Sequence, residues 1–173
     1  AVTEARPAGA LGSRGATSRR QVVAWALWDW ATQPFQTVIT TFVFAVYITS
    51  SAFGDTNSTS QSLSLSTTIA GVIVALIAPV LGQNSDRTGR TVRNLSILTW
   101  VLAALSASLF FVRPDPGYLW LGLGILGVGS IVAEIANVNY YSLIDEVATP
   151  ADVGRVSGFG WGLGYLGGIV VLL

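Results

Sequence analysis

Five stretches of this sequence are long and apolar enough to cross a lipid bilayer as helices, and they constrain the fold more than any other feature. A helix needs about 20 mostly apolar residues to span the hydrocarbon core. Apolar residues make up 51% of the chain and charged residues only 10%, whereas a soluble domain has roughly 25% charged residues. A chain this short has too little polar surface to cover so much apolar surface in water. We therefore predict an all-α membrane protein whose partner is the lipid bilayer, with spans at about 22–50, 62–82, 95–112, 118–143 and 158–173.

The two ends of the chain differ in character. Residues 1–21 are rich in Ala, Gly, Ser, Thr and Arg without an apolar run, which predicts a flexible cytoplasmic tail rather than a signal peptide. The fifth apolar stretch continues to Leu173 without a cap or a charged flank. Residues 22–173 are accordingly predicted to form a partial transmembrane bundle that lacks the rest of the same chain.

Arginine placement predicts the orientation. If the N-terminus is cytoplasmic, Arg113 alone lies outside and the other eight arginines lie inside. These eight are Arg6, Arg14, Arg19, Arg20, Arg87, Arg90, Arg93 and Arg155. An excess of basic residues in cytoplasmic segments is the strongest determinant of membrane topology, so we predict a cytoplasmic N-terminus.

The composition also excludes several classes of function. The chain has no Cys and no His, which argues against thiolate or imidazole metal sites and against His-based catalysis. The net charge is zero, so no overall field favours nucleic acid. We predict no metal, no cofactor, no nucleic-acid partner and no enzymatic activity.

Polar residues inside the first predicted span form one stripe. At about 100° per residue they fall on one side of a helix. Pro34 lies within the stripe and predicts a kink that frees backbone carbonyls. The stripe consists of Asp29, Gln33, Gln36, Thr40 and Tyr47.

The fourth predicted span carries a second stripe with the same spacing, formed by Ser130, Glu134, Asn137 and Tyr141. Neither stripe suits a lipid-facing surface, because intramembrane acids are costly and usually face a protein interior or a water-filled cavity. The simplest arrangement brings both stripes to one cavity for a polar solute or a coupling proton. The alternative is that they only hydrogen-bond helix to helix. The candidate cavity residues are Asp29, Gln33, Gln36, Glu134, Asn137 and Tyr141.

Two other residue patterns favour structural roles. Trp25, Trp28 and Trp30 near the start of the first span predict an aromatic belt at the membrane interface. Glycines in the fourth and fifth spans favour close helix packing, most clearly those spaced by four residues in the fifth. The latter are Gly160, Gly164 and Gly168.

The connection between the second and third spans carries a motif. Gly82 to Arg90 reads G-x-x-x-D-R-x-G-R and resembles the cytoplasmic loop signature of the major facilitator superfamily, although Thr91 stands where a second basic residue is common. Gly89 permits a turn at positive φ, and Arg87 and Arg90 can pair with acids of neighbouring cytoplasmic loops. The predicted gate loop residues are Gly82, Asp86, Arg87, Gly89 and Arg90.

Two further stretches, residues 24–31 and 141–168, resemble the vacuole effluxer-like branch of that superfamily, with departures at Tyr141 and Asp145. This resemblance implies about twelve spans in two halves, a midplane solute site lined by the first and fourth spans of each half, and amino acid export by some members. It implies a secondary transporter, with proton coupling as one hypothesis, in a bacterial cytoplasmic membrane. The alternative function is a non-transporting scaffold or receptor-like membrane protein.

Overall fold

The computed structural model describes residues 18–173, apart from the side chains of residues 84–88. Within that part of the chain every regular element is helical, which confirms the predicted all-α class. The first predicted span forms α1 (Arg19–Pro34), the π-helix η1 (Phe35–Phe42) and α2 (Phe44–Ile48), followed by a short 3₁₀ turn η2 (Ser51–Phe53). The remaining elements are α3 (Thr56–Thr88), α4 (Thr91–Ser108), η3 (Leu109–Phe111), η4 (Pro116–Tyr118), α5 (Leu119–Ser142), α6 (Ile144–Val147) and α7 (Val153–Leu172).

Three helical stretches of the described chain are long and apolar enough to cross a membrane: Thr56–Gln83, Thr91–Phe111 and Pro116–Val147. They correspond to the second, third and fourth predicted spans. The first predicted span is interrupted by η1 and the fifth, α7, is rich in glycine. That these two segments also cross the bilayer remains a prediction.

Two boundaries differ from those expected. Residues 1–17 of the expected tail lie outside the described residues, but α1 already begins at Arg19, because the backbone can continue its helical hydrogen bonds beyond the apolar segment. The helix α3 runs six residues past the predicted end of the second span, through Thr88, so that only Gly89 and Arg90 connect it to α4.

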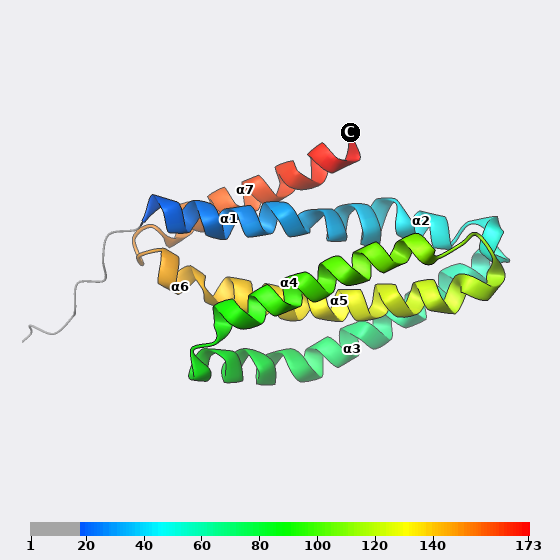
Figure 1. The fold of residues 1–173 in the computed structure, drawn as a ribbon, viewed down its shortest axis with the longest axis horizontal. Coiled ribbons are helices and arrows are strands. Elements are labelled where there is room, and N and C mark those ends of the chain that lie inside the picture. Colours follow the sequence, from blue (N-terminus) through cyan, green and yellow to red (C-terminus); the bar gives the residue numbers. More distant parts are fainter. Residues whose placement is uncertain (1–17) are drawn as a thin grey trace, which may run out of the picture.

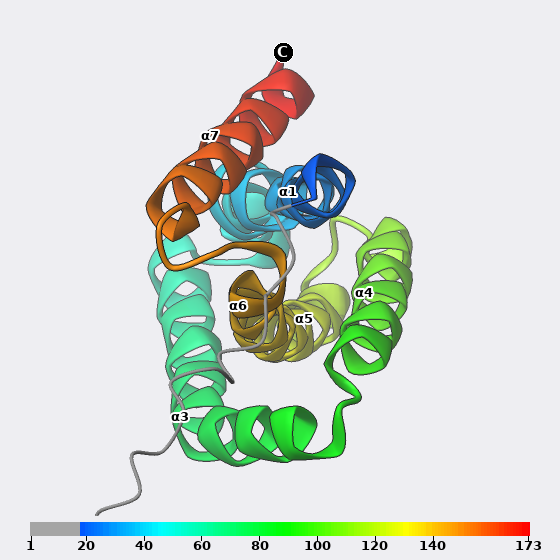
Figure 2. The same cartoon turned by 90° about the vertical axis from the view of Figure 1, so that its left-hand side faces the viewer.

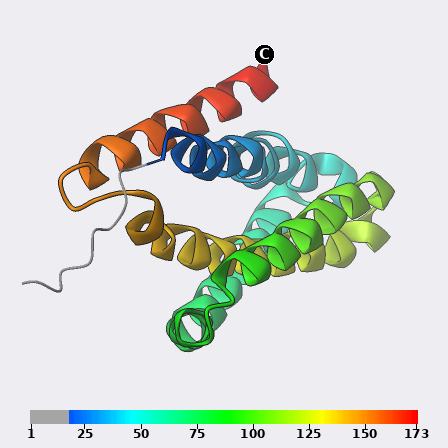
Figure 3. The same ribbon diagram turned by 60° about the vertical axis from the view of Figure 1, so that its left-hand side comes forward.

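The helices form two groups that meet along α5. Figure 1 shows α3, α4 and α5 running along the long axis of the molecule, with α1 and α7 on the other side. Seen end-on, α5 lies centrally between α3 and α4 (Figure 2), and the most extensive contacts join α5 to these two helices and α1 to α7. Figure 3 shows α1 between α7 and the α4–α5 pair. The helix α3 contains Pro79 and bends, as expected where a proline removes a helical hydrogen bond.

Apolar side chains hold the two groups together at both ends. At the end nearer the N-terminus, Trp25, Leu95, Tyr140 and Val156 come from α1, α4, α5 and α7. At the other end, Ile48, Phe53, Leu109, Leu123 and Leu126 form a second cluster. The outer faces of α3, α4 and α7 remain apolar and exposed, with Leu76, Trp100 and Val170 as examples, which suits contact with lipid.

Candidate functional site

A small polar pocket lies where α1, α5 and α7 approach one another. It has a volume of about 130 Å³ and is lined by Asp29 and Gln33 of α1, Tyr141 of α5, and Trp161 and Tyr165 of α7. Three of the six predicted cavity residues, Asp29, Gln33 and Tyr141, therefore line one cavity. The pocket joins the two polar stripes, since each contributes at least one lining residue.

Asp29 lies directly against a glycine of the neighbouring helix α7. A Cβ added at Gly164 would collide with the carboxylate of Asp29, so a larger residue there would require this side chain to move. Asp29 itself is half-buried. Within the described chain its carboxylate has no hydrogen-bond or ion-pair partner. An unpaired acid in this setting is costly and therefore a candidate functional group.

The second acid, Glu134 of α5, meets the first stripe further along the bundle. The amide Nε2 of Gln36 donates a long hydrogen bond of 3.4 Å to Glu134 Oε1. Glu134 is exposed, and Tyr141 lies close enough to interact electrostatically with both Glu134 and Asp29. Two carboxylates, one from α1 and one from α5, thus lie within electrostatic range of the same tyrosine.

The remaining stripe residues of α5 are less engaged with α1. Ser130 donates a hydrogen bond to the carbonyl of Leu126 in its own helix, at 2.9 Å. Asn137 is half-buried between Glu134 and Tyr141 on the same helix. Neither residue lines the pocket.

The π-helix η1 changes the direction of the first stripe. It begins directly after Pro34, where the missing N–H and the ring disturb the α-helical ladder. The hydroxyls of Thr40 and Thr41 donate to carbonyls five residues back, at 3.2 and 2.8 Å. Single π turns widen the helix, change its phase and occur often at functional sites. The helix type changes directly after Pro34, whereas a kink at this residue stays a prediction.

Because of that change of phase, Tyr47 does not continue the polar stripe. Its hydroxyl donates to the carbonyl of Val112 at 3.1 Å, and its ring packs edge-on against Phe53 with centroids 5.0 Å apart. The predicted stripe requires about 100° per residue along the whole segment. In the π-helix η1 each residue turns the chain by a smaller angle, so residues beyond it face another direction. Tyr47 is therefore partly buried against the apolar cluster at the far end of the bundle.

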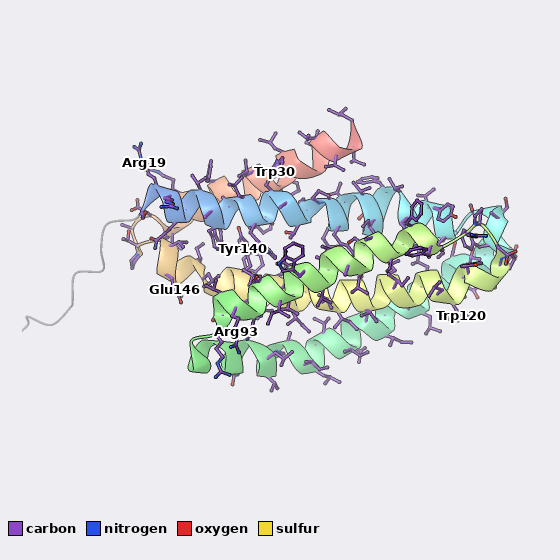
Figure 4. All side chains as sticks on the ribbon, in the orientation of Figure 1. Arg19, Trp30, Arg93, Trp120, Tyr140 and Glu146 are labelled. Atoms are coloured by element: carbon purple, nitrogen blue, oxygen red, sulfur yellow. The ribbon has the colours of Figure 1, made fainter. Side chains whose placement is uncertain are left out.

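The tryptophans expected at a membrane interface mostly point inward. Trp25 and Trp28 stack on opposite sides of Tyr140, with centroids 4.3 and 4.6 Å away. The indole of Trp25 donates to the Tyr140 carbonyl at 3.0 Å, and that of Trp28 donates to Thr99 at 2.8 Å. Buried indoles need such partners, and these partners could not be predicted from the spacing of residues within one helix. Tyr140 extends from α5 toward α1 in Figure 4.

The Tyr140 hydroxyl is buried without a hydrogen-bond partner among the described residues. We expect Tyr140→Phe to leave the free energy of unfolding unchanged or raise it by about 1 kcal/mol, because it removes a polar group that makes no bond. Trp25→Phe is the opposing case, since it removes the indole N–H that donates to the Tyr140 carbonyl and leaves that carbonyl with the Leu143 N–H alone, and it is expected to cost about 1–2 kcal/mol. Unfolding of both variants in detergent by added denaturant measures the difference. A clear loss of stability in Tyr140→Phe would contradict this assignment.

The predicted gate loop is partly described. Gly82 lies against Val138 of α5, where an added Cβ would sit 2.9 Å from a methyl group. Gly89 has φ of 62°, as predicted from the motif. The side chains of Asp86 and Arg87 lie outside the described residues. The backbone there is helical, so these two residues do not form the open turn that was expected. Arg90 is exposed at the start of α4.

Gly89→Ala tests the turn. At a φ of 62°, an L-residue is disfavoured by roughly 1–2 kcal/mol. We expect the free energy of unfolding to fall by about 1 kcal/mol. Gly71→Ala in α3 is the matched control, because its added Cβ meets nothing within 4 Å. Thermal unfolding of the parent and both variants in the same detergent compares them. Gly71→Ala should unfold at the midpoint of the parent or above it, and a Gly89→Ala midpoint equal to that of the parent would show that the turn is not strained.

The pocket also includes two residues that the sequence did not single out, Trp161 and Tyr165 of α7. They are 50% and 58% exposed and lie one turn apart, with ring centroids 6.1 Å apart. The fifth apolar stretch was interpreted as a packing helix, which is correct for its glycine face. Gly160, Gly164, Gly167 and Gly168 contact Trp25, Asp29, Trp30 and Thr37 of the first predicted span. In the sequence, the four-residue spacing of Trp161 and Tyr165 beside the glycine face could have indicated that both rings lie on one side of the helix.

Metal chemistry finds no support in the described part of the chain. No group of three acids, or of acids with Cys or His, is placed there to hold a metal ion.

Comparison with known proteins identifies the family. The family model described as Major Facilitator Superfamily matches residues 3–172. An uncharacterized MFS-type transporter of Bacillus subtilis (strain 168), YxiO, is 31% identical over 155 residues, which cover 87% of this chain. This chain spans only 36% of that relative's length. No solved structure gives a significant match. The matched residues include both polar stripes and the connection at Gly89, and the chain belongs to the major facilitator superfamily.

Proposed function

We propose that the protein is a secondary transporter that moves a small polar solute across the membrane by alternating access. The observation that carries this proposal is the pocket that joins Asp29 and Gln33 of α1 to Tyr141 of α5. Helices that only support one another would close such polar residues into hydrogen bonds. Here the carboxylate of Asp29 has no partner among the described residues, and an open polar space lies beside it.

The second acid supports a coupling role. Glu134 is exposed and bonded only loosely to Gln36, at 3.4 Å. Proton-coupled transporters use intramembrane carboxylates that gain and lose a proton during the cycle. We propose Glu134 as the residue that binds a proton, and Asp29 as the residue that binds the solute.

The finer proposals rest on resemblance and topology. The stretches at residues 24–31 and 141–168 support membership of the vacuole effluxer-like branch and, with it, efflux of an amino acid. In Figure 4, Arg19 and Arg93 lie at the same end of the bundle, whereas Trp120 lies at the other end. This distribution supports a cytoplasmic N-terminus in a bacterial cytoplasmic membrane. Arg87 and Arg90 would then belong to a cytoplasmic gate.

Flux measurements test the proposal. The full-length protein is reconstituted in liposomes, and uptake of labelled amino acids, amines and sugars is followed with and without a pH gradient. Saturable uptake that exceeds protein-free liposomes is the expected result. No flux of any solute in either orientation would favour the scaffold or receptor-like alternative.

A further inference from the structure

The pocket at Asp29 combines one negative charge with an aromatic wall. Asp29 is the only charged residue among its five lining residues, and Tyr141, Trp161 and Tyr165 are three of the other four. Gln33 supplies the remaining polar group. This composition is typical of sites that recognise organic cations, in which rings surround the positive charge.

The charge of the pocket is not balanced by the protein. No Arg lines the pocket, and Asp29 forms no ion pair within the described residues. A second carboxylate, that of Glu134, also interacts electrostatically with Tyr141. Two acids without a basic residue make this region attractive to a cation and repulsive to an anion.

The three aromatic side chains of the pocket are partly exposed. Tyr141, Trp161 and Tyr165 are 46%, 50% and 58% exposed, although each reaches the pocket. Trp161 and Tyr165 follow one another on successive turns of α7, with their rings inclined by 56°. Two tilted rings one turn apart can present their faces to a single group. Tryptophan is the strongest of the aromatic residues in attracting a cation.

Packing of α7 against α1 places the two aromatic rings next to the carboxylate of Asp29. Gly164, which lies between Trp161 and Tyr165 in sequence, contacts Asp29 directly. The stretch of α7 that lies against the carboxylate therefore also carries both rings. The volume of about 130 Å³ suits a small head group rather than a large solute.

We propose that this pocket binds the ammonium group of a small organic cation, with Asp29 neutralising its charge and Trp161, Tyr165 and Tyr141 enclosing it. That the bound cation is also the transported substrate rests on the proposed transport function. Binding of the cation can be measured without transport. It assigns the substrate class of the site as an organic ammonium ion.

Choline binding tests the assignment. Labelled choline is titrated against the full-length protein in nanodiscs, beside 3,3-dimethylbutan-1-ol, which has the same shape without the charge. We expect saturable binding of choline and none of the neutral isostere. Equal binding of both, or displacement of choline by an equal concentration of sodium chloride, would overturn the proposal.

Substitutions of pocket residues test whether choline binds at this pocket. Asp29→Asn is expected to raise the Kd for choline at least about tenfold, because it removes the countercharge. Trp161→Leu is expected to raise it about three- to thirtyfold. Trp120→Leu is the control, because Trp120 is 67% exposed at the other end of the bundle (Figure 4). If Asp29→Asn does not fold, Trp161→Leu decides, since its side chain is half-exposed and away from the glycine contacts. An unchanged Kd in Trp161→Leu would then overturn the proposal.

Choline binding and solute flux distinguish the cation site from the transport function. Specific choline binding without choline flux in liposomes would support the cation site and contradict the transporter. Flux of neutral solutes or anions without choline binding would support the transporter and overturn the cation site.

Discussion

Glu134→Gln in the full-length protein is expected to reduce net solute uptake driven by a pH gradient by at least about tenfold. Gln has nearly the same shape and keeps an oxygen that can accept from Gln36 Nε2, as Glu134 Oε1 does now. What it loses is the ability to carry a proton, and a single essential proton-transfer group contributes roughly 10²–10⁴-fold in comparable chemistry. Uptake into liposomes across an imposed pH gradient measures this effect.

Solute exchange separates the two roles of the carboxylate. Exchange of labelled for unlabelled solute requires binding and reorientation but no net proton movement. If Glu134 couples the proton, the variant retains exchange while it loses net uptake. If it binds the solute, both are lost. Asp145→Asn, a change at an exposed acid of α6, serves as the control and should leave both unchanged. Normal net uptake and normal pH dependence in Glu134→Gln would refute the proposed role.

Gly167→Ala is expected to lower the free energy of unfolding by about 1–3 kcal/mol, the usual cost of overfilling a well-packed contact. An added Cβ at Gly167 would press on the backbone carbonyl of Trp30 in α1. A backbone atom in a helix cannot move aside as the end of a side chain can. The α1–α7 contact, one of the most extensive in the bundle, would have to open. Denaturant unfolding in detergent, followed by circular dichroism, measures the change.

Gly162→Ala is the matched control on the same helix. Its Cβ would meet nothing within 4 Å. Ala favours a helix over Gly by roughly 1 kcal/mol, so this variant should be as stable as the parent or slightly more stable. Opposite signs for the two substitutions would establish that α7 packs on α1 through one glycine face. Equal destabilisation, or none in Gly167→Ala, would be inconsistent with that packing.

The sequence by itself determined the class of the protein and the main candidates for its site. Long apolar runs fix helices, because a bilayer leaves no other way to satisfy the backbone of a single segment. The i, i+4 spacing placed Asp29 and Gln33 on one face, and the structure has both at the pocket. Gly89 was predictable for the same local reason, since its φ of 62° is a property of one residue.

Only the tertiary structure decided which of these residues meet. Tyr47 left the polar stripe because η1 altered the phase of the first segment, which a constant helical period cannot express. Trp25 is buried and Trp28 partly buried, because Tyr140 and Thr99, more than 70 positions away in sequence, supply their hydrogen-bond partners. Trp161 and Tyr165 joined the site because the glycine face of α7 turned them beside Asp29. Spacing within a helix is local and can be read from the chain, whereas contacts between helices depend on packing that no single segment encodes.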